Sequence, residues 1–271
     1  MKYQAVFSDI DGTLLNNAHR VTDDTRRALA RLRGMGIPFA LVSARSPAAM
    51  APIQQANGFQ GPLISFSGAL ILEEDGTVVH SQGMCLAQVR EIITFAESEG
   101  LDMAWCLYSA RQWLVRDRRD PRVAMEEGIV GLQAENLPAG TWPREDTFYK
   151  ILCICNPAAA PQIRQKMKDR FPHLSIVPSS EMMLEIMVGG VSKGLAVQRL
   201  CVHWGIDPRN AIALGDNYND LPMLDAVGCP VVMGNAPADI QARFPFVTAD
   251  NEHDGVARAL ETLVFSADRE P

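Results

Sequence analysis

Two aspartates, Asp9 and Asp11, lie one residue apart directly after the short apolar run Ala5-Val6-Phe7. Like charges this close resist joint ionisation, so the arrangement is unfavourable unless something compensates it. A hard cation such as Mg²⁺ relieves the repulsion, and phosphate substrates commonly bind together with that metal. A turn at the end of a strand would explain the same residues without any chemistry, because Asp and Gly are favoured in turns. The pattern alone is therefore only a moderate indication of a metal site.

Three further polar signals lie far apart in the sequence. Ser43 ends an apolar run in ALVSAR, and Lys193 begins a predicted helix in GGVSKG. The third signal is the segment ALGDNYND, which carries Asp216, Asn217, Asn219 and Asp220. Each has an ordinary alternative, because serine caps helices, lysine is often solvated and Asn-rich turns are common. A lysine at a helix start is nevertheless electrostatically unfavourable, which is what a functional lysine predicts.

The elements that must position these residues alternate between strands and helices in the first and last thirds of the chain. Apolar runs predict buried strands just before the aspartate pair, the serine and the ALGDNYND segment. Helical spacing predicts helices over 22–36, 192–204 and 221–227. Such alternation indicates a parallel, doubly wound α/β sheet. Ligands of such sheets bind at the carboxyl ends of the strands, so we expect the four signals to meet there.

The middle of the chain has a different pattern. Its predicted strands are longer and paired, as in LDMAWCLYS with RQWLVR and LSIVPSS with MMLEIMV. Helices are expected around 86–99 and 158–170. This pattern indicates an α+β domain inserted into the first domain. The expected boundaries are residues 1–82 and 188–271 for the core and residues 83–187 for the insertion.

Composition and charge favour an ordinary globular protein. Of the 271 residues, 47% are hydrophobic and 21% are charged. No apolar stretch approaches the roughly 18 residues needed to cross a bilayer, and the start reaches acidic residues too early for a secretory signal. The net charge of −7 argues against general attraction to nucleic acid or to anionic membranes. We therefore expect a cytoplasmic protein without a nucleic-acid or membrane partner.

The six cysteines raise the question of a zinc site. Cys153 and Cys155 lie in the apolar run ILCIC, where both side chains face the same way along a strand. Zinc needs further ligands at suitable spacing, and the histidines and other cysteines offer none. Buried reduced thiols are the expected state, and zinc is not a predicted cofactor. The insertion also contains Trp105, Trp113 and Trp142, which we expect in its core rather than on a substrate platform.

Together the four polar signals suit phosphoryl transfer, which requires a nucleophile in line with phosphorus and donors around its equatorial oxygens. Asp9 would be a nucleophile that forms an aspartyl-phosphate. Asp11 would act as general acid and then as general base toward water. Asp216 would help to hold Mg²⁺. Backbone amides and three polar side chains would contact the phosphate, namely Ser43, Lys193 and Asn219.

The motifs DIDGTLL, LVSAR, GVSKG and GDNYNDLPML resemble, in this order, the four motifs of the haloacid dehalogenase-like (HAD) phosphohydrolases. The insertion resembles the type IIB cap of the Cof-type subfamily. LEIMVGGVSKG and the tail VVMGNA…VTADNEHDGV are similar to that subfamily as well, so the resemblance covers essentially the whole chain. It implies a Rossmann-like, doubly wound parallel core with an inserted α+β cap domain.

The resemblance also implies roles for individual residues. Asp9 is the expected nucleophile, and Mg²⁺ is expected between the side chains of Asp9 and Asp216 and the backbone carbonyl of Asp11. Phosphate contacts are implied for two backbone amides and three side chains, those of Ile10, Ala44, Ser43, Lys193 and Asn219. Asp220 is expected to orient Lys193 without touching the substrate.

The resulting hypothesis is a Mg²⁺-dependent phosphatase that hydrolyses small phosphorylated metabolites, such as sugar phosphates, with the insertion closing as a lid. A phosphomutase or phosphotransferase with the same aspartate nucleophile is the main alternative. A non-catalytic phospho-aspartate receiver module is less favoured, because such modules are shorter and lack a cap. The natural substrate, the cap residues that select the leaving group and the oligomeric state stay open. So does the effect of Ser67, which stands in SFSGALI where the subfamily usually has Asn.

Overall fold

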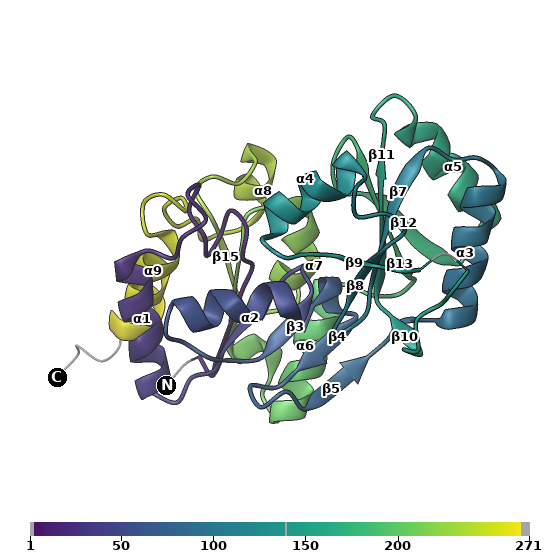
Figure 1. Cartoon of the computed structure of the whole chain (residues 1–271). Coiled ribbons are helices and arrows are strands. Elements are labelled where there is room, and N and C mark those ends of the chain that lie inside the picture. Colours follow the sequence, from purple (N-terminus) through teal and green to yellow (C-terminus); the bar gives the residue numbers. More distant parts are fainter. Residues whose placement is uncertain (1–2, 139, 267–271) are drawn as a thin grey trace. The chain divides into compact units, whose positions relative to one another are not determined.

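The computed structural model describes residues 3–138 and 140–266, and it divides into two compact units (Figure 1). The first unit contains the described residues up to Arg45, then Met50–Ser81, and those from Val191 onward. The second unit contains Gln82–Gly190 and the short segment Ser46–Ala49. Each unit has its own sheet and its own hydrophobic core, so each is described separately.

The first unit is built on a seven-stranded sheet. Its strands are β1 (Ala5–Ser8), β2 (Phe39–Val42), β3 (Leu63–Ser65), β4 (Leu70–Leu72), β5 (Val78–Ser81), β14 (Ala211–Gly215) and β15 (Cys229–Val232). Their order is β15-β14-β1-β2-β3-β4-β5. The strands from β15 to β3 are parallel, and β3, β4 and β5 pair antiparallel. The predicted α/β class and parallel core are confirmed, with an antiparallel hairpin at one edge.

Helices and short turns connect these strands. The helices are α1 (Asp23–Gly34), α2 (Pro47–Ala56), α6 (Lys193–Trp204), α7 (Leu221–Leu224), α8 (Ala238–Arg243) and α9 (Gly255–Leu260). The turns are the 3₁₀ segments η1 (Phe66–Gly68), η2 (Pro208–Asn210) and η3 (Tyr218–Asp220) and the π-helical η4 (Glu261–Phe265). The helix predicted over 221–227 is too long, since α7 ends at Leu224. Beyond it, a Cβ at Gly228 would lie 2.0 Å from the Arg209 carbonyl oxygen, so only glycine permits this close packing before β15.

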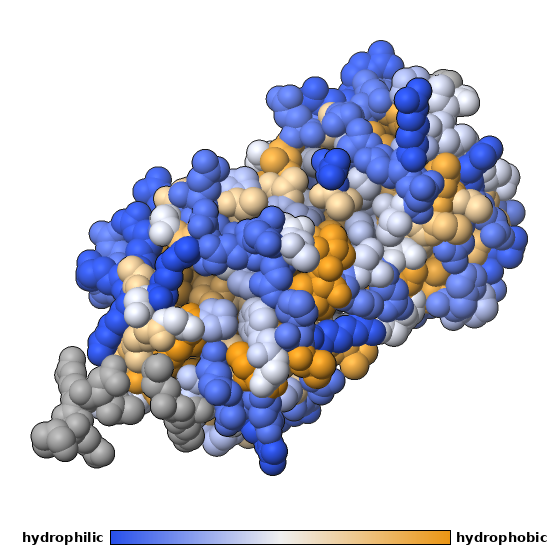
Figure 2. Space-filling view, turned by 90° about the horizontal axis from the view of Figure 1, so that it is seen from below, coloured by the Kyte–Doolittle hydropathy of each residue, from blue (hydrophilic) through white to orange (hydrophobic). Residues whose placement is uncertain are grey.

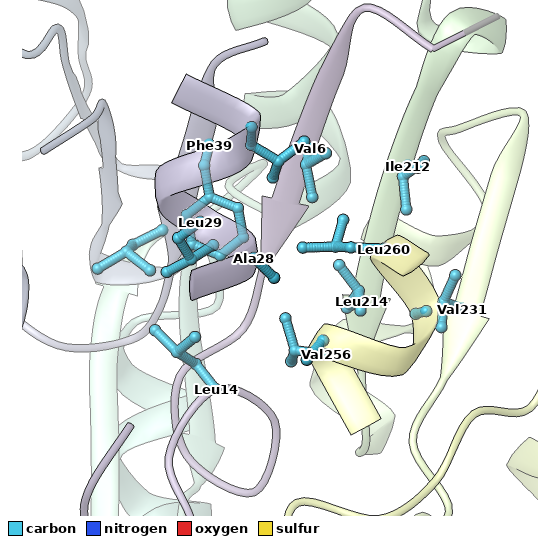
Figure 3. Packing of buried hydrophobic residues seen from close by; sticks show 14 of the residues in the cluster. Val6, Leu14, Ala28, Leu29, Phe39, Ile212, Leu214, Val231, Val256 and Leu260 are labelled. Atoms are coloured by element: carbon cyan, nitrogen blue, oxygen red, sulfur yellow. The ribbon is translucent and has the colours of Figure 1, made fainter. Parts of the chain in front are cut away.

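Both faces of the sheet are covered, as the alternation of side chains along the strands requires. Val6 of β1 packs with residues of α1 and α9, including Leu29 and Leu260 (Figure 3). The neighbouring residues Ala5 and Phe7 point to the other face and join a cluster with α6 and α7. The sheet is therefore doubly wound, and its central strands are buried on both sides.

Three of the predicted polar signals follow strands that run in the same direction. Asp9, Ser43 and Asp216 come directly after β1, β2 and β14. In the ladder, Ser8 pairs with Leu214 on one side and with Leu41 on the other, so the three strands end at nearly the same level. The parallel register thus places these residues at one edge of the sheet, as expected for an open α/β sheet.

The second unit is dominated by a six-stranded sheet. Its strands are β7 (Met103–Tyr108), β8 (Trp113–Val115), β9 (Glu135–Asn136), β11 (Lys150–Cys155), β12 (Leu174–Pro178) and β13 (Met183–Val188). Their order is β12-β13-β11-β7-β8-β9, and all neighbours pair antiparallel except β8 with β9. A second, two-stranded ladder joins β6 (Met84–Cys85) and β10 (Thr147–Phe148).

Three helices belong to the second unit, α3 (Leu86–Ser98), α4 (Pro121–Val130) and α5 (Ala160–Arg170). Helices α3 and α5 match the predicted ones and pack with one face of the sheet in a core that includes Trp105 and Cys153. Helix α4 was not predicted. Its start has a recognisable signal, because Asp120 accepts from the N–H of Arg122 at 2.9 Å and a proline opens the first turn. All six cysteines are free thiols.

The visible face in Figure 2 is mostly hydrophilic, with apolar patches between polar side chains. Among residues 3–138 and 140–266, no helix is both long and apolar enough to span a membrane.

Candidate active site

The predicted nucleophile, Asp9, lies at the carboxyl end of β1 in the middle of the parallel strands. Its N–H donates to the carbonyl of Leu214 at 3.0 Å, and its own carbonyl accepts from the Ser8 hydroxyl at 2.7 Å. The residue is only 6% exposed. Strand pairing on both sides therefore fixes the backbone from which this carboxylate projects.

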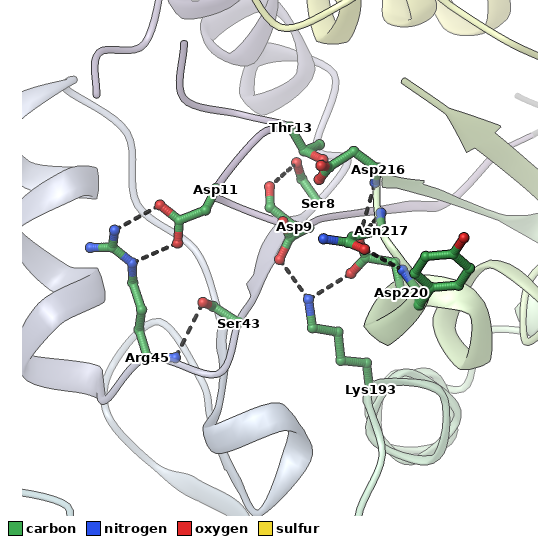
Figure 4. A network of polar contacts seen from close by, with 11 residues as sticks. Ser8, Asp9, Asp11, Thr13, Ser43, Arg45, Lys193, Asp216, Asn217 and Asp220 are labelled. Atoms are coloured by element: carbon green, nitrogen blue, oxygen red, sulfur yellow. Dashed lines mark hydrogen bonds and ion pairs between the residues drawn. The ribbon is translucent and has the colours of Figure 1, made fainter. Parts of the chain in front are cut away.

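Lys193 brings a cation to Asp9 from a distant part of the chain. It is the first residue of α6, after the N-cap Ser192, whose hydroxyl accepts from the N–H of Leu195. The ammonium donates to Asp9 Oδ1 and to Asp220 Oδ1, both at 2.6 Å (Figure 4). The lysine is almost fully buried, and a buried cation requires such partners. Although burial opposes the charge, Asp9 and Asp220 raise the pKa of Lys193 above its ordinary value.

Asp220 is fully buried and uses both carboxylate oxygens within the protein. Oδ1 accepts from Lys193, and Oδ2 accepts from the N–H groups of Asp216 and Asn217 at 3.0 and 3.1 Å. A Cβ at Gly215 would lie 2.6 Å from the Asp220 Cβ, so only glycine permits this close packing. The arrangement suits orientation of Lys193 better than binding of a metal.

Asp9, Asp216 and Asp220 form an acidic cluster in which one oxygen of each lies within 4.8 Å of the others. Burial is the main cause that raises the pKa of Asp9 above its ordinary value and the pKa of Asp216 to about 6, and Asp220 adds to both. Lys193 balances only part of this negative charge. Carboxylate oxygens are ligands that Mg²⁺ prefers, so the donor set fits a divalent cation held by Asp9 and Asp216.

Asp216, which follows β14, is held by the loop after β1. The Thr13 hydroxyl donates to its Oδ1 at 2.9 Å. Gly12 lies against the same carboxylate, where its φ is +82° and a Cβ would approach Asp216 Oδ2 to 2.4 Å. Glycine is therefore required at position 12 by both backbone conformation and space.

Asp11 has a different environment from Asp9. Its side chain is 47% exposed and accepts from Arg45 with both oxygens, from Nε at 2.8 Å and from Nη2 at 2.7 Å. Ser43 is buried at the end of β2, where its hydroxyl accepts from the N–H of Arg45 at 3.2 Å. In Figure 4 the two aspartates direct their carboxylates toward different cations, Asp9 toward Lys193 and Asp11 toward Arg45.

The remaining predicted residues lie in three kinds of environment. Ile10 is fully buried, Ala44 is partly buried, and Asn219 is exposed in η3. The structure thus brings together one group of predicted residues, Asp9, Lys193, Asp216 and Asp220, and places another, Asp11 and Ser43, around Arg45. Phosphate contacts from Ile10, Ala44 and Asn219 stay predictions.

Sequence reasoning missed two asparagines that support the loop after β1. Asn235, just after β15, donates to the Gly12 carbonyl at 2.8 Å and accepts from the N–H of Asn251 at 3.1 Å. Asn251 donates to the Leu15 carbonyl at 3.0 Å. Both lie in the tail that resembles the Cof-type subfamily. The position of Asn235, directly after a strand of the same parallel sheet, is the signal by which sequence could have found it.

The turn η1 supports two parts of the site. The N–H of Ser67 donates to the Ser43 carbonyl at 2.9 Å. A Cβ at Gly68 would lie 2.6 Å from the Ser192 carbonyl oxygen, so the turn also packs closely on the start of α6. Ser67 has a φ of 55°, in a region where Asn is enriched among non-glycine residues. Backbone conformation at this position therefore favours Asn as well as Ser.

Comparison with known proteins identifies the family of this chain. A model of the haloacid dehalogenase-like hydrolases matches residues 6–260. A Haemophilus influenzae protein, provisionally named as a phosphatase, is 36% identical over 266 residues, which cover 96% of this chain and 98% of the relative. The Bacillus subtilis 5-amino-6-(5-phospho-D-ribitylamino)uracil phosphatase YitU is 25% identical over 268 residues, which cover 93% of this chain and 94% of the relative.

Solved structures show the same fold. A haloacid dehalogenase-like hydrolase from Bacteroides thetaiotaomicron has a TM-score of 0.88 at 24% identity, covering 96% of this chain and 99% of that one. A HAD subclass IIB sugar phosphatase has a TM-score of 0.78 at 20% identity, covering 96% of this chain and 98% of that one. The chain therefore belongs to the haloacid dehalogenase-like hydrolase family, as a Cof-type member with the fold of subclass IIB.

Proposed function

We propose that this protein is a Mg²⁺-dependent phosphatase that hydrolyses small phosphorylated metabolites through an aspartyl-phosphate on Asp9. The observation that carries the proposal is the convergence of Asp9, Lys193 and Asp216 at one edge of the parallel sheet. A positioned nucleophile, a fixed cation and a further carboxylate for a metal ion are what phosphoryl transfer requires. Both relatives described above are named as phosphatases, which supports the same reaction class.

The proposed reaction has two steps. Because Oδ1 of Asp9 is held by Lys193, Oδ2 is the oxygen that attacks phosphorus. Asp11 donates a proton to the leaving oxygen, and it later accepts one from the water that hydrolyses the aspartyl-phosphate. General acid and base help of this kind contributes roughly 100-fold or more to the rate.

The phosphate group would be held by donors around the nucleophile. These are the side chains of Ser43, Lys193 and Asn219 and the backbone amides of Ile10 and Ala44. Mg²⁺, when bound by Asp9, Asp216 and the Asp11 carbonyl, supplies positive charge against the phosphate oxygens.

The insertion over residues 83–187 is proposed to act as a cap that excludes bulk water and selects the leaving group. Of the two relatives described above, only one is named for a substrate, so the substrate of this chain is proposed only as a class. A cytoplasmic location is part of the same proposal.

Release of inorganic phosphate from p-nitrophenyl phosphate and from a panel of phosphorylated metabolites tests the proposal. We expect release that requires Mg²⁺, stops with EDTA and is absent in Asp9→Asn. The matched control Asp169→Asn removes an exposed carboxylate on α5 and should leave turnover unchanged. Isomerisation of a sugar phosphate without phosphate release would indicate a phosphomutase instead. Slow decay of an acyl-phosphate without turnover of any ester would indicate a receiver module.

A further inference from the structure

Arg45 holds both carboxylate oxygens of Asp11, at 2.8 Å from Nε and at 2.7 Å from Nη2. The backbone of Arg45 is itself anchored on both sides. Its N–H donates to the Ser43 hydroxyl at 3.2 Å, and its carbonyl accepts from the N–H of Phe66 at 3.0 Å. The guanidinium is therefore presented from a fixed loop, and its side chain is only 21% exposed.

The pairing restricts a carboxylate that would otherwise be mobile. The Asp11 side chain is 47% exposed, and an exposed carboxylate normally samples several rotamers. Two parallel N–H···O bonds from one guanidinium fix both the direction and the plane of the carboxylate.

The pairing also separates two carboxylates with different tasks. Asp9 is bound by Lys193 within the acidic cluster, whereas Asp11 is directed toward Arg45 (Figure 4). Without Arg45, Asp11 would be free to turn toward a cation bound by Asp9 and Asp216. A carboxylate bound to that cation would no longer be available to transfer a proton.

We propose that Arg45 is a positioning residue for Asp11, which keeps the Asp11 carboxyl group oriented for proton transfer and apart from the acidic cluster. The inference rests on the proposed function. In the step that uses it as an acid, Asp11 carries a proton on one oxygen while the other oxygen accepts from Arg45. As the Asp9 Oδ2–phosphorus bond forms and the phosphorus–oxygen bond of the ester breaks, the leaving oxygen keeps the electron pair and takes that proton, and Asp11 becomes the carboxylate that Arg45 binds with two N–H groups. Arg45 neither gives nor takes a proton in this step.

The test compares aryl phosphates whose leaving groups differ in acidity. A poor leaving group such as phenolate depends on the proton from Asp11, whereas p-nitrophenolate leaves with little help. For Arg45→Gln we expect kcat with phenyl phosphate to fall about 10-fold to 100-fold, and kcat with p-nitrophenyl phosphate to fall only a few-fold. Arg45→Lys should recover part of the loss, because lysine keeps the charge but not the paired geometry.

A double-mutant cycle separates positioning from direct action. In the Asp11→Asn background, Arg45→Gln should cause no further loss with either ester, because its effect passes through Asp11. Competitive inhibition by inorganic phosphate should be the same in wild-type protein and in Arg45→Gln. The matched control is Arg33→Gln on α1, which breaks an exposed ion pair with Glu74 and should leave both rates unchanged.

Two results would overturn the role of Arg45 while wild-type turnover is intact. Equal losses with both esters, together with weaker inhibition by phosphate, would show that Arg45 binds the phosphate itself. Additive losses in the double mutant would show that it acts independently of Asp11. No phosphate release by the wild-type protein from any ester would overturn the proposed function, and this inference with it.

Discussion

Each of the two units contains a buried lysine that binds a carboxylate, and the two differ in how closely carboxylates are grouped around the lysine. In the first unit, Nζ of Lys193 lies 2.6 Å from Oδ1 of Asp9 and from Oδ1 of Asp220. Asp216 belongs to the same acidic cluster. Negative charge therefore exceeds positive charge around this lysine. The lysine and its partners come from three distant segments of the chain.

In the second unit, Lys150 on β11 donates to Glu185 on the neighbouring strand β13 at 3.2 Å. The ammonium also lies 5.1 Å from the centre of the Tyr108 ring. This contact joins two adjacent strands of the sheet. Lys150 and Glu185 are each only 8% exposed, so the ion pair is buried in the sheet together with its apolar neighbours.

The difference teaches which buried charges indicate a ligand. An ion pair between adjacent strands is accounted for by a structural role. Three carboxylates whose oxygens lie within 4.8 Å of one another repel each other, and a bound cation relieves this repulsion. The close grouping of carboxylates, rather than the burial of a lysine, therefore distinguishes the proposed active site from the ion pair of the second unit.

The largest expected effect concerns the nucleophile. Asp9→Asn should reduce phosphate release by about 10⁴-fold or more, because the attacking oxygen is lost. Glu185→Gln in the second unit should leave kcat per folded molecule within a few-fold of the wild-type value, since this carboxylate is not part of the proposed chemistry. Both are measured by phosphate release at saturating ester. Equal losses in the two variants would contradict the distinction drawn here.

The next effect concerns the metal. Asp216→Ala should raise the Mg²⁺ concentration needed for half-maximal activity by about 10-fold to 100-fold, with partial rescue at high Mg²⁺, because a ligand oxygen is removed.

In the wild-type protein, titration calorimetry without substrate should show weaker Mg²⁺ binding as pH falls. Mg²⁺ binds the ionised carboxylate of Asp216, whose pKa without metal is raised to about 6. Below that pH, protons compete with Mg²⁺ for the carboxylate and weaken its binding. Binding that is independent of pH between about 5 and 7.5 would contradict this ligand role.

The next prediction compares the two lysines by the effect of their removal on stability and activity. Lys193→Met and Lys150→Met should each lower the free energy of unfolding by about 3 kcal/mol or more, since both leave buried carboxylates uncompensated. Adding Glu185→Leu to Lys150→Met should restore most of the stability, because an apolar pair replaces the ion pair. Adding Asp220→Leu to Lys193→Met should not restore activity. Denaturant unfolding and phosphate release check the two outcomes, and recovered turnover in the second double variant would contradict the role of Lys193.

The smallest expected effect lies in the turn η1. Ser67→Asn should raise the free energy of unfolding by about 0.5 kcal/mol with kcat unchanged, because Asn tolerates the positive φ at this position better than Ser. Ser180→Asn, at an exposed position of the second unit without positive φ, is the control and should change stability by less. A fall in kcat with Ser67→Asn would show that position 67 contacts the substrate.

Much of the fold was predictable because local pattern and topology agree. Alternating apolar runs and helical spacing predicted the parallel core, and the rule that ligands bind at the carboxyl ends of strands predicted where Asp9, Ser43 and Asp216 lie. The errors arose where tertiary contacts decide. Helix α7 ends at Leu224, and the chain after it packs Gly228 against the backbone of Arg209. Helix α4 begins at a cap on Asp120 within a segment that otherwise resembles an exposed charged loop.

By itself the sequence determined the reaction class, because residue types and their order along the chain specify both the motifs and the direction of the strands that carry them. Only the tertiary structure decided which acidic side chain pairs with which basic side chain. It joined Asp9 to Lys193 and Asp11 to Arg45, and it placed Asn235 against the loop after β1. Such pairings depend on distances between segments far apart in the chain, and those distances follow from packing of the whole sheet rather than from any local pattern.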